Sequence, residues 1–241
     1  MSEHIYTIPV NEAFDTSMAE AENGVCRCPF CRIYEKLEAT ELDLILGASM
    51  MEPDVRQKTN EAGFCRKHFN MLMKGKNRLG LGLILESHLA ELRQKFGKSG
   101  MAAMLSGKGS GEAEAAAENS ESCYICNRIE YTFSRILKNA ALLWDEDPDF
   151  KKKIAAQPQF CLTHYGMWLK VAKEELGKKK FAAFYDDVSP VMLRYFDELA
   201  ADVSWFCKKF DYRYENEPWG NAKNAIERAA DFLQCENSDK R

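Results

Sequence analysis

The stretch Cys28-Pro29-Phe30-Cys31 begins the first of two copies of one cysteine-containing pattern. Its second motif is Gly63-Phe64-Cys65-Arg66-Lys67-His68, and 33 residues separate Cys31 from Cys65. The later copy consists of Cys123-Tyr124-Ile125-Cys126 and Gln159-Phe160-Cys161-Leu162-Thr163-His164, with 34 residues between Cys126 and Cys161. Because the spacing and the flanking residues repeat together, the pattern indicates an internal duplication.

Each copy offers three thiols and one imidazole, which is the donor set of a closed tetrahedral zinc site. A two-residue spacer lets both members of each motif reach one ion, and residues three apart share a face of a helix. We therefore predict two Cys3His zinc sites, one in each copy. The first would consist of Cys28, Cys31, Cys65 and His68, and the second of Cys123, Cys126, Cys161 and His164.

Two other chemistries use the same residues. An iron–sulfur cluster can be held by a Cys3His set. A Cys-x-x-Cys motif at the start of a helix is also typical of thiol oxidoreductases, although these place it in a βαβ context that this sequence lacks. In a redox sensor Cys26, which has no counterpart in the second copy, would serve as the resolving thiol.

The composition limits the classes of protein to consider. The 241 residues are 46% hydrophobic and carry a formal charge of −4, which indicates a globular chain without the basic stripe of a nucleic-acid binder. Apolar runs are too short for a membrane span, and the N-terminus lacks the pattern of a secretory signal. We therefore expect a cytoplasmic protein with no membrane or nucleic-acid partner, in which clustered thiols bind metal rather than form disulfides.

Apolar residues at helical spacing predict an all-α fold. We expect residues 1–96 to form an N-terminal helical unit, 97–122 a flexible linker rich in Gly, Ser, Ala and Glu, and 123–241 a C-terminal helical unit. Residues 4–10 would be an extended arm, followed by a short helix over 11–21. His88 lies off the apolar stripe of its helix and is expected at the surface.

The C-terminal region combines aromatic and charged residues. A last helix over 221–233 would lie across the seam between the copies. Asp211, Arg213 and Glu217 lie among tyrosines and a tryptophan, so they are the residues of a possible enzyme site. Cys207 and Cys235 are expected to be buried structural cysteines.

With these motifs established, the sequence resembles a bacterial family of uncharacterised proteins known as a domain of unknown function. The resemblance covers nearly the whole chain. It is carried by the cysteine motifs, by Thr59-Asn60-Glu61-Ala62 before Gly63, and by Phe210-Asp211-Tyr212-Arg213 with Glu217-Pro218-Trp219. It implies no particular activity.

These observations favour a non-enzymatic, zinc-stabilised helical protein with a binding role. Two zinc ions per chain would be structural, and the copies would pack pseudo-symmetrically because one copy alone is small for a stable core. A protein or a small molecule would then bind in the cleft between the copies. The alternative function is a thiol-based zinc redox sensor or oxidoreductase.

Overall fold

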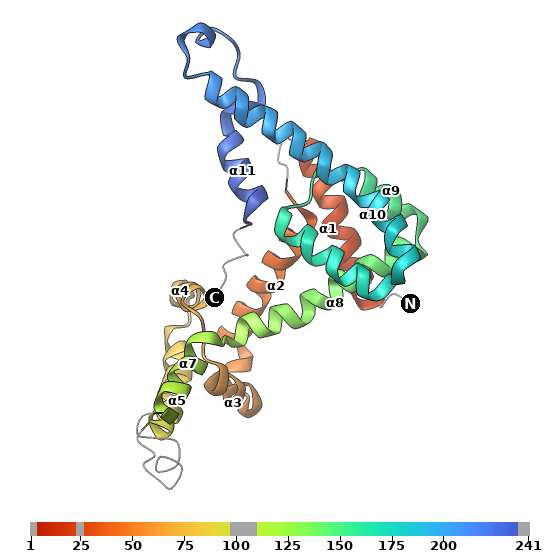
Figure 1. Cartoon of the computed structure of the whole chain (residues 1–241). Helices are drawn as coiled ribbons and strands as arrows, with labels where there is room; N and C mark the ends of the chain where they lie inside the picture. The colour runs from red at the N-terminus through yellow and green to blue at the C-terminus, as the bar shows by residue number, and fades with distance from the viewer. Residues whose placement is uncertain (1–3, 23–26, 97–109, 236–241) are drawn as a thin grey trace. The chain divides into compact units, whose positions relative to one another are not determined.

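The computed structural model describes residues 4–22, 27–96 and 110–235, and within them the chain is helical with no β-strand (Figure 1). The predicted all-α class is confirmed. The first half contains α1 (His4–Glu22), α2 (Pro29–Leu46), α3 (Pro53–Ala62), α4 (Arg66–Lys74) and α5 (Arg78–Lys95). The second half contains α7 (Ser110–Glu121), α8 (Tyr124–Glu146), α9 (Pro148–Ala155), α10 (Leu162–Lys208) and α11 (Ala225–Leu233).

The prolines that follow α2 and α8 begin short helices, as expected. Pro53 and Pro148 occupy the first turn of α3 and α9, where the missing backbone N–H is not needed. The carboxylate of Asp147 caps α9 by accepting a hydrogen bond from the backbone N–H of Asp149 at 2.9 Å. Both copies therefore pass from a long helix into a short one.

The expected extended arm at the N-terminus is wrong from residue 4 onward, because α1 already begins at His4 and continues through Pro9. Val10 and Phe14 are fully buried, and the ring of Phe14 lies 4.9 Å from that of Phe150 in α9. Burial of this apolar face outweighs the hydrogen bond that a proline removes from a helix.

The expected flexible linker is helical in its second half. Residues 97–109 lie outside the described part, but Ser110–Glu121 forms α7, which contacts α3 and α5. Ala and Glu are strong helix formers and fill this helix, and Ala115 is buried against the rest of the protein. The composition of residues 97–122 taken as a whole did not distinguish this Ala- and Glu-rich helix from the Gly-rich residues that precede it.

The chain divides into two compact units, and the bounds 1–96 and 123–241 expected for the sequence copies stay a prediction. One comprises the described parts of Met1–Glu35 and Phe133–Lys240, and the other the described parts of Lys36–Thr132. The boundaries fall inside α2 and α8, so each of these helices begins in one unit and ends in the other. We call them the outer unit and the inner unit, after their places along the chain.

Each unit has its own core. In the outer unit, aromatic rings from α1, α2 and α10 pack edge to face, with the ring of Trp168 4.9 Å from those of Phe30 and Phe184. In the inner unit the core is aliphatic and includes Ile45, Leu72 and Ile84, each at most 1% exposed. These cores hold the helix ends that carry the cysteine motifs.

The 47-residue helix α10 is interrupted at Gly177, whose φ of 69° and ψ of 164° are not helical. A residue with a side chain strongly disfavours this region of backbone space. Gly177→Ala should therefore destabilise the protein by about 1–3 kcal/mol, measured by urea unfolding followed by circular dichroism. Gly166→Ala is the matched control, because Gly166 lies in the same helix and nothing lies within 4 Å of either added methyl group. Equal stability of the two variants would contradict this account.

Candidate metal centres

The structure brings the eight predicted residues into two compact groups, but it pairs the motifs differently from the prediction. Within each group, one donor atom per residue lies within 4.8 Å of all the others. The outer group consists of Cys28, Cys31, Cys161 and His164, and the inner group of Cys65, His68, Cys123 and Cys126. The expectation that each Cys-x-x-Cys pairs with the Cys-x-x-His of its own copy is wrong.

The lengths of the helices agree with the exchange. After Cys31 the chain follows α2, whose 18 residues span about 27 Å, whereas α3 has only 10 residues and spans about 15 Å. In the second copy α8 has 23 residues and α9 has 8. The second helix of each copy covers only part of the length of the first, and the Cys-x-x-His motif of each copy meets the Cys-x-x-Cys of the other copy.

The outer group is built from the first turns of α2 and α10. Cys161 is the N-cap of α10 and its Sγ accepts a hydrogen bond from the backbone N–H of His164 at 3.5 Å. Sγ of Cys31 lies 3.6 Å from Sγ of Cys161 and 3.3 Å from Nδ1 of His164. All four residues are buried, and the positive ends of two helices favour thiolate there.

The inner group repeats this construction with the first turns of α4 and α8. Nδ1 of His68 lies 3.2 Å from Sγ of Cys65 and 3.3 Å from Sγ of Cys123. The sulfurs of Cys65 and Cys126 are 3.9 Å apart. These two cysteines are only partly buried, so solvent approaches the inner group more closely than the outer one.

The residue that supports each histidine ring differs between the groups. In the inner group Nε2 of His68 lies 3.1 Å from a carboxylate oxygen of Glu38, which also pairs with Lys67 at 2.9 Å. In the outer group the ring of His164 packs against that of Phe133, with centroids 5.0 Å apart. Glu38 and Phe133 are corresponding positions of the two copies, 95 residues apart. Sequence analysis missed both, although the alignment of the copies paired them.

Electrostatics favour charge separation in the inner group. Burial would raise the pKa of Glu38, but hydrogen bonds from His68 and Lys67 lower it. Burial would lower the pKa of His68, yet Cys123 and Glu38 raise it to about 9. Hydrogen bonding to Cys126, opposed by burial and aided by His68, lowers the pKa of Cys123 to about 3.

In each group the pKa of one thiol is lowered while that of a neighbouring thiol is raised. In the outer group the pKa of Cys28 is well below its usual value, because hydrogen bonds from Cys161, Cys31 and His164 outweigh burial. The pKa of Cys31 is raised through its contacts with Cys161, Cys235 and Cys28. In the inner group contact with Cys123 and burial raise the pKa of Cys126. A divalent cation would displace the protons of the other thiols and offset the negative charge of the thiolates that result. The groups are therefore chemically suited to hold a metal ion.

A fifth sulfur lies beside the outer group. The thiol of Cys235, just after α11, is within hydrogen-bonding contact of Cys31 and Cys161, and it is 6% exposed. The expectation that Cys235 is buried is confirmed, but its neighbours were not anticipated, because no motif surrounds it. Cys207 is exposed, contrary to expectation, since it lies near the end of α10. Cys26 lies outside the described residues.

The residues of the possible enzyme site lie at the surface. Asp211 and Arg213 pair with each other at 2.6 Å, and the pairing lowers the pKa of the carboxyl group. Glu217 is exposed, and its backbone carbonyl accepts a hydrogen bond from Nζ of Lys209 at 2.6 Å. Lys209, which is buried, also donates to the carbonyls of Tyr214 and Glu215. This segment is therefore a turn organised around a lysine.

His88 is buried, contrary to the expectation of a surface residue. Its Nδ1 lies 2.8 Å from the backbone oxygen of Asn60, and its Nε2 lies 3.0 Å from the side-chain oxygen of Asn119. The ring thereby joins α5 to α3 and α7. The polar neighbours come from elements distant in sequence, so the helical pattern around His88 could not reveal them.

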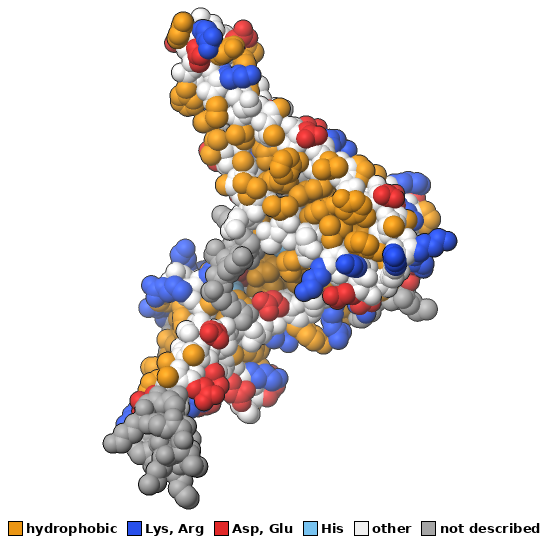
Figure 2. Space-filling model, viewed as in Figure 1, with side chains coloured by type: hydrophobic (Ala, Val, Ile, Leu, Met, Phe, Trp, Pro, Cys, Tyr) orange, Lys and Arg blue, Asp and Glu red, His pale blue; other side chains and the backbone are white. Residues whose placement is uncertain are grey.

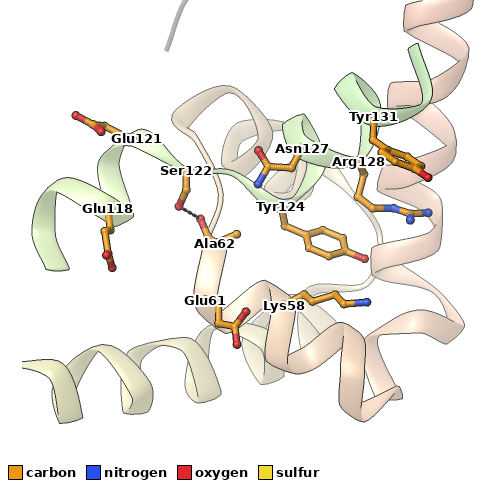
Figure 3. A pocket seen from close by; sticks show the side chains of 10 residues that line it. All are labelled: Lys58, Glu61, Ala62, Glu118, Glu121, Ser122, Tyr124, Asn127, Arg128 and Tyr131. Atoms are coloured by element: carbon orange, nitrogen blue, oxygen red, sulfur yellow. Dashed lines mark hydrogen bonds between the residues drawn. The ribbon is translucent and has the colours of Figure 1, made fainter. Parts of the chain in front are cut away.

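A pocket of about 570 Å³ opens within the inner unit, beside the inner group (Figure 3). Its floor is Tyr124, which lies between Cys123 and Cys126 in sequence. Lys58 and Arg128 lie below and above the hydroxyl end of this ring, Glu61 lies near Lys58, and Glu118 and Glu121 lie farther away on the opposite side (Figure 3). The lining combines α3 of the first copy with α7 and α8. The pocket is therefore bounded by residues of both copies.

The fold and these groups define a class: a helical protein with two Cys3His groups able to hold metal ions. The chain belongs to a family of unknown function, DUF6062, whose model matches residues 1–240. No curated protein and no solved structure matches the chain. Over the described residues, every helix is too short or too polar to cross a membrane.

Proposed function

We propose that this is a helical binding protein stabilised by two structural zinc ions, one in each Cys3His group. The spacing of the donor atoms carries the proposal. Zn–S bonds of about 2.3 Å and Zn–N bonds of about 2.0–2.1 Å give tetrahedron edges of about 3.8 Å between sulfurs and about 3.6 Å between sulfur and nitrogen. One sulfur pair in each group matches this edge, since Cys31 and Cys161 lie 3.6 Å apart and Cys65 and Cys126 lie 3.9 Å apart, and sulfur–nitrogen spacings of 3.2–3.4 Å occur in the inner group.

Such compact donor sets support a single tetrahedral ion over a multi-iron cluster, which would spread its ligands over several iron atoms. The ligands of each group would fill the four positions of zinc, which is typical of structural sites. All eight cysteines of the described residues are free, as expected of thiols in a reducing compartment such as the cytoplasm.

Metal analysis tests the proposal. Protein purified without added metal should contain close to two zinc ions per chain by plasma mass spectrometry. Iron accompanied by visible absorbance, or protein that folds cooperatively with no metal, would contradict it.

Glu38 would orient His68 as a zinc ligand, because a carboxylate on the far nitrogen of a ligating histidine fixes the ring and raises its basicity. Glu38→Gln should weaken zinc binding at the inner group by about 10–100-fold and leave the outer group unchanged. Competition with a chromogenic chelator measures both affinities. The control is Glu41→Gln, since Glu41 is similarly buried on α2 but pairs with Arg128, at 3.2 Å. Equal effects of the two variants would refute the specific role of Glu38.

The binding role is supported by the pocket in the inner unit. An aromatic floor flanked by both cations and carboxylates suits a small ligand with an apolar body and two opposite charges. Residues of both sequence copies line the pocket, in agreement with the proposed inter-repeat site. Each metal group also takes one motif from each copy, which supports the proposed duplication.

A ligand-observed NMR screen of zwitterionic aromatic fragments tests this role. Tyr131, which is 58% exposed in the pocket lining, can be replaced by alanine without opening a core. Tyr131→Ala should abolish the binding signals that the wild type shows, whereas Tyr212→Ala, on an 85% exposed tyrosine of the outer unit, should preserve them. Fragment binding that is insensitive to Tyr131 would place the ligand elsewhere.

An exposed apolar surface of the outer unit supports a protein partner. Figure 2 shows hydrophobic side chains gathered over α10. In α10 Leu193 is 60% and Phe196 is 48% exposed. Apolar surface of this kind is typical of interaction sites.

A further inference from the structure

The outer group has one sulfur more than a tetrahedral ion can use. Cys28, Cys31, Cys161 and His164 supply four donors, and Cys235 contacts the sulfurs of Cys31 and Cys161 from the segment after α11. A buried cysteine is ordinarily inert because it has no thiolate and no reactive neighbour. Cys235 has two neighbours that become thiolates when the group holds a metal ion.

The inner group has no such additional thiol. In the sequence of Lys36–Thr132 the cysteines are Cys65, Cys123 and Cys126, and all three already belong to the group. The two groups therefore differ in the chemistry available after oxidation, because among the described residues of its own unit the outer group has a neighbouring thiol that can form a disulfide without removing a second ligand, and the inner group does not.

We propose that Cys235 is the resolving thiol of a reversible disulfide with Cys31, formed when a hydroperoxide oxidises the outer group. This inference rests on the proposed metal centres. Cys31 is the first target because it is 7% exposed, whereas Cys28 is 2% and Cys161 is 1% exposed. Its thiolate is also a ligand, so its oxidation removes one of the four donors.

The chemistry needs one peroxide per disulfide. The Cys31 thiolate attacks a peroxide oxygen and the O–O bond breaks, which leaves a sulfenic acid on Cys31 and a hydroxide that takes a proton from solvent to become water. The sulfur of Cys235 then attacks the Cys31 sulfur, and the S–O bond breaks. Hydroxide leaves and takes the thiol proton of Cys235 to form a second water. The two cysteines are oxidised by two electrons, which reduce the peroxide.

The disulfide would release the ion of the outer group and tether the segment after α11 to the first turn of α2. The inner group would keep its ion. Oxidation would thus change the metal content of the protein by one ion, and a thiol reductant with added zinc would reverse the change.

The test treats full-length, zinc-loaded protein with limiting hydrogen peroxide. Released zinc is measured with a chromogenic chelator, and the disulfide is mapped by mass spectrometry of non-reduced tryptic peptides. We expect a linked pair joining Cys31 to Cys235, with fragmentation separating Cys31 from Cys28, and release of one zinc ion per chain. Cys235→Ser should abolish the linked pair, whereas Cys207→Ser, on an exposed cysteine outside both groups, should leave linkage and release unchanged.

Several results would overturn the inference. These are a disulfide between Cys28 and Cys31, a link from Cys31 to Cys26, or Cys235 recovered as a free thiol after zinc release. The zinc content before peroxide treatment separates the two proposals. Two ions per chain without the Cys31–Cys235 link would refute the resolving thiol and leave the metal centres standing, whereas protein without zinc would refute the metal centres themselves.

Discussion

The double variant Cys28→Ser with His164→Ala is expected to retain one zinc ion per chain, and Cys28→Ser with His68→Ala to retain none. Cys28 and His164 belong to the same group, so the second substitution removes a ligand from a site that is already lost. Cys28 and His68 belong to different groups. Because structural zinc contributes free energy on the order of 10 kcal/mol in small sites, the second variant should also unfold far more readily.

Native mass spectrometry gives the zinc count, and thermal unfolding gives the stability. The single variants serve as controls, and each should retain one ion. The opposite pattern, with no ion in the first double variant and one ion in the second, would show that each motif pairs within its own copy.

Separated halves of the chain should lose both metal centres. Residues 1–96 contain Cys28 and Cys31 of the outer group with Cys65 and His68 of the inner group, and residues 123–241 contain the complementary motifs. Each half therefore has two incomplete sites. We expect each half alone to be largely unfolded by circular dichroism and to bind zinc much more weakly than the intact chain, since neither site has more than two of its four ligands.

Mixing the halves with zinc should restore helicity and two ions per pair of fragments. A titration of one half with the other, followed by circular dichroism and chelator competition, measures the recovery. If either half alone folds with one tightly bound zinc ion, the exchanged pairing is wrong and each copy is an independently folding domain.

The ligand types and the helical class were accessible from the sequence because they depend on local patterns. Four short motifs at repeated spacing identify the eight residues of the two groups, and Pro53 and Pro148 mark helix starts through their own backbone chemistry. The pairing was not accessible in the same way. The pairing depends on the distance in space between the Cys-x-x-Cys and Cys-x-x-His motifs of one copy, which is set by the directions of α2 and α3. The number of intervening residues does not determine those directions.

The residues that were missed are placed by tertiary contacts. Glu38 and Cys235 lie outside every motif, and each reaches its group from a different helix or from a segment distant in sequence. α1 continues through Pro9 because Phe14 is buried among rings of other helices. The residues next to these positions in the sequence do not indicate which distant helices they will contact.

The exchange between the copies sets an order of assembly during synthesis. The inner group is complete once Cys126 has left the ribosome, whereas the outer group must wait for His164, 38 residues later. At about 5–20 residues per second this delay is roughly 2–8 s. During that interval Cys28 and Cys31, the first of these residues to be made, have no completed partner set, so the oldest part of the nascent chain would be the last to acquire a metal ion.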